Sequence, residues 1–316
     1  MVHAIPTLPR IPIEEPARPS PRAPLALRAV RTAFKWFGPW APEALADWAT
    51  RLYFSPRRHP VSPRDAQWLV GSDLEWIETE RGRIAVYAWP YGGLFPWEQP
   101  RERGNVLLVH GWEGRGAQLG AFVDPLRTAG YRVVAFDAPA HGRSSGQRAT
   151  LFGFSRAIQR VAELHGPFDA VIAHSMGVPS VALAIAQGFE VERAVLIGGP
   201  SRFDRVTSRF ARELAMNDAI EAHFRGNLEA KFGDDVWEKF DAQALTENTP
   251  ESLILHDVDD RFVHFSEAEH LAASWDRARL IATAGLGHHR ILRDPMVLET
   301  SVRFLAGEGG LRRISA

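Results

Sequence analysis

The chain has 316 residues, 45% of them hydrophobic, and its 37 Lys and Arg nearly balance its 38 Asp and Glu. This balance gives no reason to expect nucleic acid or an acidic polymer as a partner, and the absence of cysteine excludes disulfides, thiol catalysis and cysteine-ligated metals. No apolar run reaches the roughly 18 residues of a membrane span. The N-terminus lacks the basic start and apolar core of a secretory signal, so a cytoplasmic protein is expected.

The first 60 residues differ in character from the rest. Residues 1–24 carry seven prolines and are expected to be extended or disordered. Helices are predicted at 25–37 and at 42–53, the second with Pro42 in its first turn. Eight of the ten tryptophans lie between Trp36 and Trp112, which indicates that this region packs against something.

The first predicted helix is basic and amphipathic, with Arg28, Arg31 and Lys35 set among apolar residues. Two interpretations stay open. One is a helix that makes peripheral contact with a membrane or covers an active site. The other is a helix whose apolar face packs on the main domain while its basic face is solvated.

From about residue 72, short apolar segments rich in β-branched residues alternate with helical ones. A hairpin is predicted at 74–79 and 83–88, followed by a Pro- and Gly-rich loop to residue 104. Further strands are predicted at 105–110, 131–137, 168–173, 193–197, 252–256 and 279–283, and helices at 117–130, 152–165, 176–188, 266–276 and 290–305.

This alternation predicts an α/β domain with a mostly parallel sheet that is covered on both faces. We expect it to occupy residues 61–316, with residues 1–60 as a separate N-terminal extension. Residues 201–249 are polar and helical with no strand, which predicts a cap inserted into the domain. Sites in such sheets lie on loops at the carboxyl ends of the strands.

An apolar run ends abruptly at Ser175, between Ala173 and Gly177. A strand that turns sharply into a helix holds its serine in a strained conformation with the hydroxyl exposed, and this requires small neighbours. The pattern predicts a nucleophile at Ser175. Acyl transfer also needs two backbone N–H groups aimed at the oxyanion. We predict the amides of Met176 and of Trp112, which follows the strand at 105–110 and Gly111, for this role.

A competing interpretation uses the glycines at 114, 116 and 120, with Asp137 near the end of the next strand. Together they form a loose dinucleotide-binding fingerprint. The glycines begin four residues beyond the strand instead of in its turn, and this interpretation leaves Ser175 unexplained.

Two more loops at strand ends carry titratable residues. The first holds Asp257, Asp259 and Asp260, any of which could orient a histidine. It lacks the glycine and closing glutamate of a calcium loop. The second holds His288 and His289 after two glycines. Because adjacent side chains diverge, a metal site at this pair is not expected.

In order along the chain, these motifs resemble the α/β-hydrolase family over about residues 72–306. The resemblance rests on four segments, namely 110–112, the Asp-x-Pro-x-His-Gly-x-Ser segment 137–144, 173–177, and 256–263 together with Gly287-His288. It implies an α/β-hydrolase fold in which Asp260 is the acid and His288 the base. Ala173 departs from the family's usual first glycine, and the neighbouring His289 leaves the base open by one position.

The resemblance implies a serine hydrolase of a carboxylic ester or thioester that needs no cofactor and no metal and acts on a small-molecule acyl substrate. Three alternatives stay open: an acyltransferase, a C–C bond hydrolase on the same residues, and a non-catalytic binding protein. Apolar residues of the cap are expected either to line an acyl pocket or to pack between helices, namely Phe203, Phe210, Leu214, Met216, Phe224, Leu228, Phe232 and Trp237.

Overall fold

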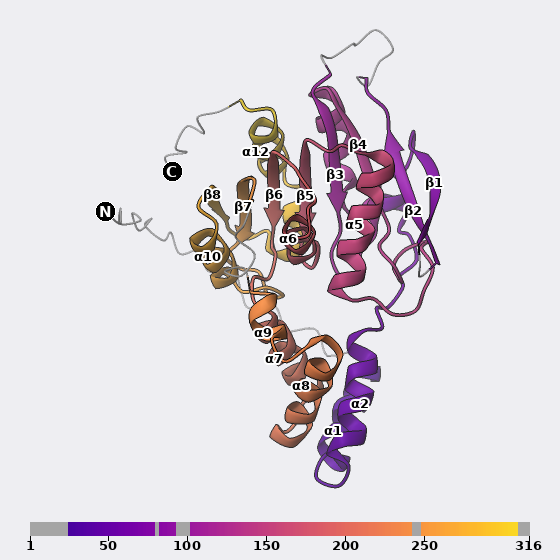
Figure 1. The fold of residues 1–316 in the computed structure, drawn as a ribbon, viewed down its shortest axis with the longest axis vertical. Helices are drawn as coiled ribbons and strands as arrows, with labels where there is room; N and C mark the ends of the chain where they lie inside the picture. Colours follow the sequence, from indigo (N-terminus) through magenta and orange to yellow (C-terminus); the bar gives the residue numbers. More distant parts are fainter. Residues whose placement is uncertain (1–24, 80–81, 93–101, 242–247, 309–316) are drawn as a thin grey trace, which may run out of the picture.

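The computed structural model describes residues 25–79, 82–92, 102–241 and 248–308. The predictions for residues 1–24, for 80–81 between the two hairpin strands, for 93–101 and for 242–247 of the cap fall outside the described residues, as do residues 309–316. One sheet forms the centre of the molecule (Figure 1). Its strands are β1 (Asp73–Thr79), β2 (Gly82–Trp89), β3 (Gly104–Val109), β4 (Tyr131–Phe136), β5 (Ala170–His174), β6 (Arg193–Ile197), β7 (Glu251–Asp257) and β8 (Ala278–Thr283).

The strand order across this 8-stranded sheet is β1-β2-β4-β3-β5-β6-β7-β8. The pairs β1–β2 and β2–β4 are antiparallel, and all the others are parallel. From β3 the chain adds β4 on one side and, after it, β5 on the other side. The parallel strands β3 and β5 are therefore neighbours, with their carboxyl ends at the same end of the sheet. The predicted fold class is therefore confirmed.

Both faces of the sheet are buried, and the period-two alternation of strand side chains divides the core into two clusters. Leu107 and Val109 point into the cluster formed with α5 (Leu151–His165), α6 (Gly177–Ala186) and α10 (Phe265–Ser274). Val106 and Leu108 point into the opposite cluster, formed with α4 (Val123–Thr128) and α12 (Pro295–Leu305). Burial on both faces explains why these strands read as continuous apolar runs.

Two predicted helices are divided in the structure. The segment expected at 117–130 is a 3-10 helix, η1 (Gly116–Phe122), followed by α4. The segment expected at 290–305 is α11 (Gly287–Arg290), η2 (Ile291–Arg293) and then α12. Pro295 lacks an N–H, so a new helix begins there, and the Asp294 side chain caps it by accepting from the amides of Met296 and Val297. A short helix, α3 (Pro63–Gln67), was not predicted, although its Ser62 cap and first-turn proline are visible in the sequence.

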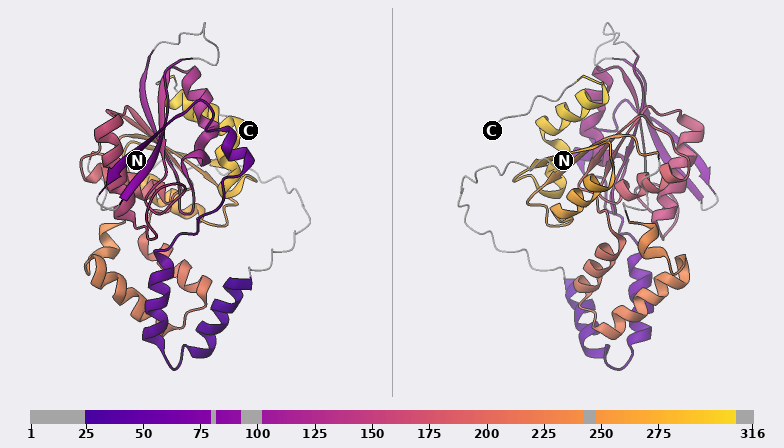
Figure 2. Two further views of the ribbon diagram at one scale, coloured as in Figure 1. Left: turned by 90° about the vertical axis from the view of Figure 1, so that its right-hand side faces the viewer. Right: turned by 60° about the vertical axis from the view of Figure 1, so that its left-hand side comes forward.

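A separate helical layer lies beyond the ends of the strands, below the sheet in Figure 1 and in both views of Figure 2. It consists of α1 (Leu25–Phe37), α2 (Pro42–Tyr53), α7 (Phe203–Leu214), α8 (Asp218–Phe232) and α9 (Val236–Lys239). Residues of α1 and α2, such as Phe34 and Ala49, share an apolar core with Phe224 and Leu228 of α8. The N-terminal helices therefore pack mainly on the inserted helices of the main domain.

The apolar residues of the insertion belong to this helical core. Leu214, Phe224 and Leu228 are buried in it, and the others pack around them, namely Phe203, Phe210, Met216, Phe232 and Trp237. The helix-packing interpretation of these residues is the one that the structure supports. None of the helices in the described part of the chain is both long enough and apolar enough to cross a bilayer.

Candidate active site

Ser175 lies in the sharp turn between β5 and α6, and its backbone has a φ of 53°, the left-handed region that a residue with a Cβ rarely adopts. The turn passes very close to β3. A Cβ at Gly177 would lie 2.6 Å from the carbonyl oxygen of Val109, and one at Gly111 would lie 2.7 Å from the Cβ of Ser175. Glycine is therefore required at both positions. The strained conformation is held by β3 and by β6, whose Ile197 carbonyl oxygen accepts from the Ser175 amide at 2.9 Å.

His288 contacts both of the other residues that the sequence singled out. Its Nε2 lies 3.0 Å from Oγ of Ser175, and its Nδ1 lies 2.6 Å from Oδ2 of Asp260. The carboxylate can only accept, so Nδ1–H donates to Asp260 and Nε2 is left to accept from the serine hydroxyl. His288 and Asp260 are both buried, whereas Ser175 is partly exposed.

The three carboxylates of the acidic loop have different partners. Asp260 accepts hydrogen bonds from the amides of Phe262 and Val263 in addition to His288. Burial raises the pKa of the Asp260 carboxyl, but the hydrogen bond and charge of His288 and these amides outweigh burial and leave the pKa below its ordinary value. The loop therefore stabilises the ionised form of Asp260.

Asp257 and Asp259 instead hold the loop that carries the histidines. Asp257 accepts from the hydroxyl of Thr283 at 2.8 Å and from the amide of Leu286 at 3.0 Å. Asp259 accepts from the amide of Gly285 at 3.0 Å. These contacts tie the loop after β7 to the loop after β8 and so fix the position of His288.

His289 does not contact the serine or the acid within the described part of the chain. Its ring packs beside Phe262 and His288, with ring centroids 5.3 and 5.0 Å apart. Burial, followed by the charge of His288, lowers the pKa of His289. Of the two adjacent histidines, only His288 is brought to Ser175 and Asp260.

Residues that the sequence analysis did not single out enclose His288. His174, directly before the serine, lies beneath it, with Nε2 2.9 Å from the carbonyl oxygen of His288 and the rings 4.6 Å apart. Burial holds the pKa of His174 well below its usual value, so it is neutral and donates this hydrogen bond. On the outer side the ring of Phe262 lies 5.2 Å from that of His288.

The helical layer contacts the acidic loop at this point. The guanidinium of Arg209 in α7 lies 5.5 Å from the ring centre of Phe262 and donates to the carbonyl oxygen of Arg261 at 3.0 Å. No local sequence signal marks Arg209, because its partners lie far away in the chain.

The backbone amides of Trp112 and Met176 were predicted to bind an oxyanion. Both residues flank Ser175, since Met176 follows it and Gly111 packs against it. Among the described residues, neither amide donates a hydrogen bond to another group. Both donors are therefore available to a ligand, and their assignment as an oxyanion hole stays a prediction.

The buried ring of His110 holds the loop after β3 in place. Nε2 of His110 accepts from the amide of Ala138 at 2.9 Å, so Nδ1–H donates to the carbonyl oxygen of Gly111 at 2.7 Å. Burial lowers the pKa of His110 to about 4, which keeps the ring neutral. The ring thus joins the carboxyl ends of β3 and β4.

Asp137 and Ser144 hold the following loop together. The carboxylate of Asp137 accepts from the amides of Gly116 and Arg143 and from the hydroxyl of Tyr87. The Ser144 hydroxyl donates to the backbone carbonyl of Asp137. This network supports the structural interpretation of the segment. Asp137 is buried and both of its carboxylate oxygens accept from protein groups, whereas dinucleotide binding would require it to face a ribose.

The glycines of that fingerprint also serve packing. A Cβ at Gly120 would lie 2.2 Å from the side chain of Trp68, and one at Gly116 would lie 3.1 Å from Tyr87. The described residues contain no group of three or more His, Asp or Glu side chains placed to hold a metal ion.

The segment after α2 contacts the loop that carries Trp112. Arg57 donates through Nε and Nη2 to the two carboxylate oxygens of Glu113, each at 2.9 Å, and through its backbone amide at 3.1 Å. Burial raises the pKa of the Glu113 carboxyl, but the hydrogen bonds and charge of Arg57 outweigh it and lower that pKa overall. Arg58 donates to the carbonyl oxygens of Gly142, Ser144 and Gly146.

The fold and this site together define the class of protein. Residues 106–300, more than half of the chain, match the model of the Alpha/beta hydrolase family, and the chain belongs to that family. One curated relative, 2-hydroxy-6-oxononadienedioate/2-hydroxy-6-oxononatrienedioate hydrolase 1 from Dechloromonas aromatica, is 37% identical over 115 residues. The match covers 31% of this chain and 38% of the relative, so the chain spans well under half of that protein's length.

Solved structures share the fold at low sequence identity. A lipase candidate from Acinetobacter baumannii superposes with a TM-score of 0.57 at 18% identity, covering 77% of this chain and 94% of its own. Carboxylesterase CesB from Bacillus subtilis superposes with a TM-score of 0.55 at 16% identity, covering 84% and 99%. An esterase from Rhodococcus sp. gives 0.54 at 16% identity, covering 76% and 100%.

Proposed function

We propose that this chain is a serine hydrolase that cleaves a carboxylic ester or thioester through an acyl-enzyme formed on Ser175. One observation carries the proposal: the ring of His288 lies 3.0 Å from the Ser175 hydroxyl and 2.6 Å from the Asp260 carboxylate. A hydroxyl in contact with a base, and a carboxylate that orients the base, are the groups that activate a serine for acyl transfer.

In the proposed reaction, Nε2 of His288 takes the proton of Ser175 while Oγ attacks the acyl carbonyl carbon. The resulting oxyanion accepts hydrogen bonds from the amides of Trp112 and Met176. His288 then gives its proton to the leaving alcohol or thiol, and the C–O or C–S bond breaks to leave the acyl group on Ser175. Water loses a proton to His288 and attacks the acyl carbon, the bond from that carbon to Oγ of Ser175 breaks, and His288 returns the proton to Oγ as the acid leaves. Asp260 stabilises the imidazolium in both halves.

Asp260 suits this role because its pKa lies below the ordinary value of a carboxyl group, so the group is a carboxylate at neutral pH. The similarity in fold to a lipase candidate, a carboxylesterase and an esterase agrees with an ester substrate. Since the fold hosts many reactions, the choice of substrate bond rests on the site and on direct assay.

Labelling with a fluorophosphonate tests whether Ser175 is activated. We expect one adduct per chain by intact mass, absent from Ser175→Ala, and turnover of short-chain p-nitrophenyl esters that the same substitution abolishes. Unlabelled protein with an unchanged circular dichroism spectrum would instead favour a non-catalytic binding protein. Ester formation with an added alcohol acceptor, exceeding release of free acid, would favour an acyltransferase.

A second candidate is hydrolysis of a C–C bond next to a ketone, favoured by the partial match to the dienedioate hydrolase. The same serine and histidine would serve it. To distinguish C–C bond hydrolysis from ester hydrolysis, the protein is incubated with a 2-hydroxy-6-oxo-dienedioate and the loss of the compound's conjugated absorbance is measured. A higher kcat/KM for this compound than for every ester of the panel would replace the ester proposal.

A further inference from the structure

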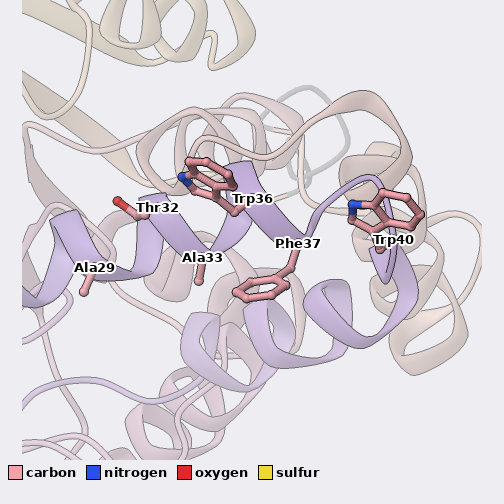
Figure 3. Close-up of a pocket in the computed structure, with 6 residues that line it drawn as sticks. All are labelled: Ala29, Thr32, Ala33, Trp36, Phe37 and Trp40. Carbon is pink, nitrogen blue, oxygen red and sulfur yellow. The ribbon is translucent and has the colours of Figure 1, made fainter.

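The outer face of α1 and the turn that follows it expose large apolar side chains. Leu25 is 79% exposed, Trp36 74%, Phe37 61% and Trp40 86%. Trp36, Phe37 and Trp40 line an open depression together with Ala29, Thr32 and Ala33 (Figure 3). A contiguous apolar surface of this kind, unlike a scattered exposed side chain, indicates a binding surface.

This exposed face is not the face that holds the helix in place. Phe34 is buried in the core of the helical layer, with Leu27 and Val30 packed beside it. Leu25, Ala29, Ala33 and Trp36 are spaced at i, i+4, i+8 and i+11, which places them on a different side of the same helix. α1 therefore has two apolar faces, and within the described part of the chain only one of them is packed.

A basic stripe borders the exposed apolar face. Arg28, Arg31 and Lys35 are spaced at i, i+3 and i+7, and all three are exposed. Within the described part of the chain, none of them forms an ion pair. α1 itself contains no acidic residue, and the nearest carboxylate along the chain is Glu43 in the first turn of α2.

The combination fits one kind of partner. Tryptophan is favoured at the boundary between lipid headgroups and acyl chains, and arginine or lysine beside an apolar helix face reaches the headgroup phosphates. A second copy of the chain fits less well, because a symmetric contact through α1 would bring two all-basic stripes together.

We propose that α1 and the turn through Trp40 bind the surface of an anionic lipid bilayer. Trp36, Phe37 and Trp40 enter the headgroup–acyl boundary, and Arg28, Arg31 and Lys35 contact the phosphates. The surface lies on the helical layer, whose α7 contacts the acidic loop through Arg209. Lipid binding would therefore hold the helical layer, which adjoins the site, against the membrane. This proposal does not depend on which ester the site accepts.

Sedimentation of the full chain with vesicles tests this surface. We expect binding to phosphatidylcholine vesicles containing about 30 mol % phosphatidylglycerol and much weaker binding to phosphatidylcholine alone. Because the attraction is partly electrostatic, raising the salt from about 0.1 M to about 0.5 M should weaken it. Replacing Arg28, Arg31 and Lys35 by Gln should lower the vesicle partition coefficient about fivefold per residue.

The apolar contribution has its own variant. Trp36→Ser with Trp40→Ser should lower partitioning about tenfold or more, while the thermal unfolding temperature changes little because both rings are exposed. Leu164→Ser and Arg160→Gln are the matched controls, since they alter an exposed leucine and a half-buried arginine towards the carboxyl end of α5, whereas its amino end packs on the helical layer through Phe152 and Phe232. Both controls should bind vesicles like the parent chain.

Three results would overturn the proposal. One is equal binding by the tryptophan variant and the parent, and another is binding that ignores lipid charge and salt. The third is a concentration-dependent dimer, detected by sedimentation velocity and lost in the tryptophan variant, with no vesicle binding; it would assign the surface to a second copy of the chain.

Discussion

Arg57 and Glu113 form a two-pronged ion pair between the segment after α2 and the loop after β3, with both contacts at 2.9 Å. Glu113 has a φ of 57° and directly follows Trp112, whose amide is a proposed oxyanion donor. The N-terminal extension thus contacts the loop that orients the Trp112 amide, a proposed donor to the oxyanion. Its helices are packed on the insertion, so both parts of the helical layer adjoin the site.

We therefore expect Arg57→Gln and Glu113→Gln each to lower kcat about tenfold through a displaced Trp112 amide, with KM changed less than about twofold. Stability should fall by only about 0–1 kcal/mol, because the Arg57 side chain is largely exposed. Arg193→Gln is the matched control. It removes an ion pair to Glu251 at the amino ends of β6 and β7, whereas the site lies at the carboxyl ends of the strands. Unchanged kcat in both Arg57 and Glu113 variants would show that the pair only attaches the extension.

Asp260 should contribute far more to turnover than its two neighbours. Asp260→Asn is expected to lower kcat by about 10⁴, because the amide no longer orients and stabilises the imidazolium of His288. Asp257→Asn and Asp259→Asn weaken only the bonds between two loops and should cost less than about tenfold. The measurement is kcat/KM for one ester in all three variants, with unfolding curves alongside. A larger loss in Asp257→Asn or Asp259→Asn, in folded protein, would contradict the choice of acid.

Substitutions of the two adjacent histidines should differ just as clearly in their effect on kcat. His288→Ala removes the proposed base and should lower kcat by about 10⁴ or more and abolish fluorophosphonate labelling. His289→Ala removes a ring that packs beside the site and should cost less than about tenfold. Labelling rates of the two purified variants decide the matter. The reverse ranking would move the role to His289.

Gly177 should be intolerant of any side chain. Its Cβ would lie 2.6 and 2.9 Å from the carbonyl oxygens of Val109 and His110, and β3 is held between two other strands and cannot retreat. Gly177→Ala is expected to destabilise the fold by about 2 kcal/mol or more, read from urea unfolding. Gly226→Ala in α8 meets no atom within 4 Å and should stabilise by about 0.5–1 kcal/mol. A harmless Gly177→Ala would show that the turn can widen.

The positions of most strands along the chain, and the burial of the sheet on both faces, could be predicted because most strands are short, β-branched apolar runs. The order of the strands across the sheet was not predicted. The small residues around Ser175 likewise marked the turn locally. What could not be predicted depends on distant contacts. Arg57 meets Glu113 across 56 positions, and α1 packs on helices that come about two hundred residues later. The division of the last helix was readable from Asp294-Pro295. The break in the helix expected at 117–130 was also readable, because Pro125 lacks the N–H that a helix continuing through it would need, and α4 begins two residues before it.

The stability of the fold should fall in mild acid because of His110. Its folded pKa is about 4 and its ordinary value is 6.5, so between these values the unfolded chain holds a proton that the folded chain excludes. The histidine's contribution is therefore fully present above pH 6.5 and is lost as pH falls toward 4. In that window the unfolding free energy should drop by about 1.4 kcal/mol per pH unit from this residue. Urea unfolding from pH 7 to 4 measures the slope. His110→Gln should lower it by that amount, and His223→Gln, on the exposed side of α8, is the matched control. A slope that His110→Gln leaves unchanged would mean that His110 takes up its proton without unfolding the chain.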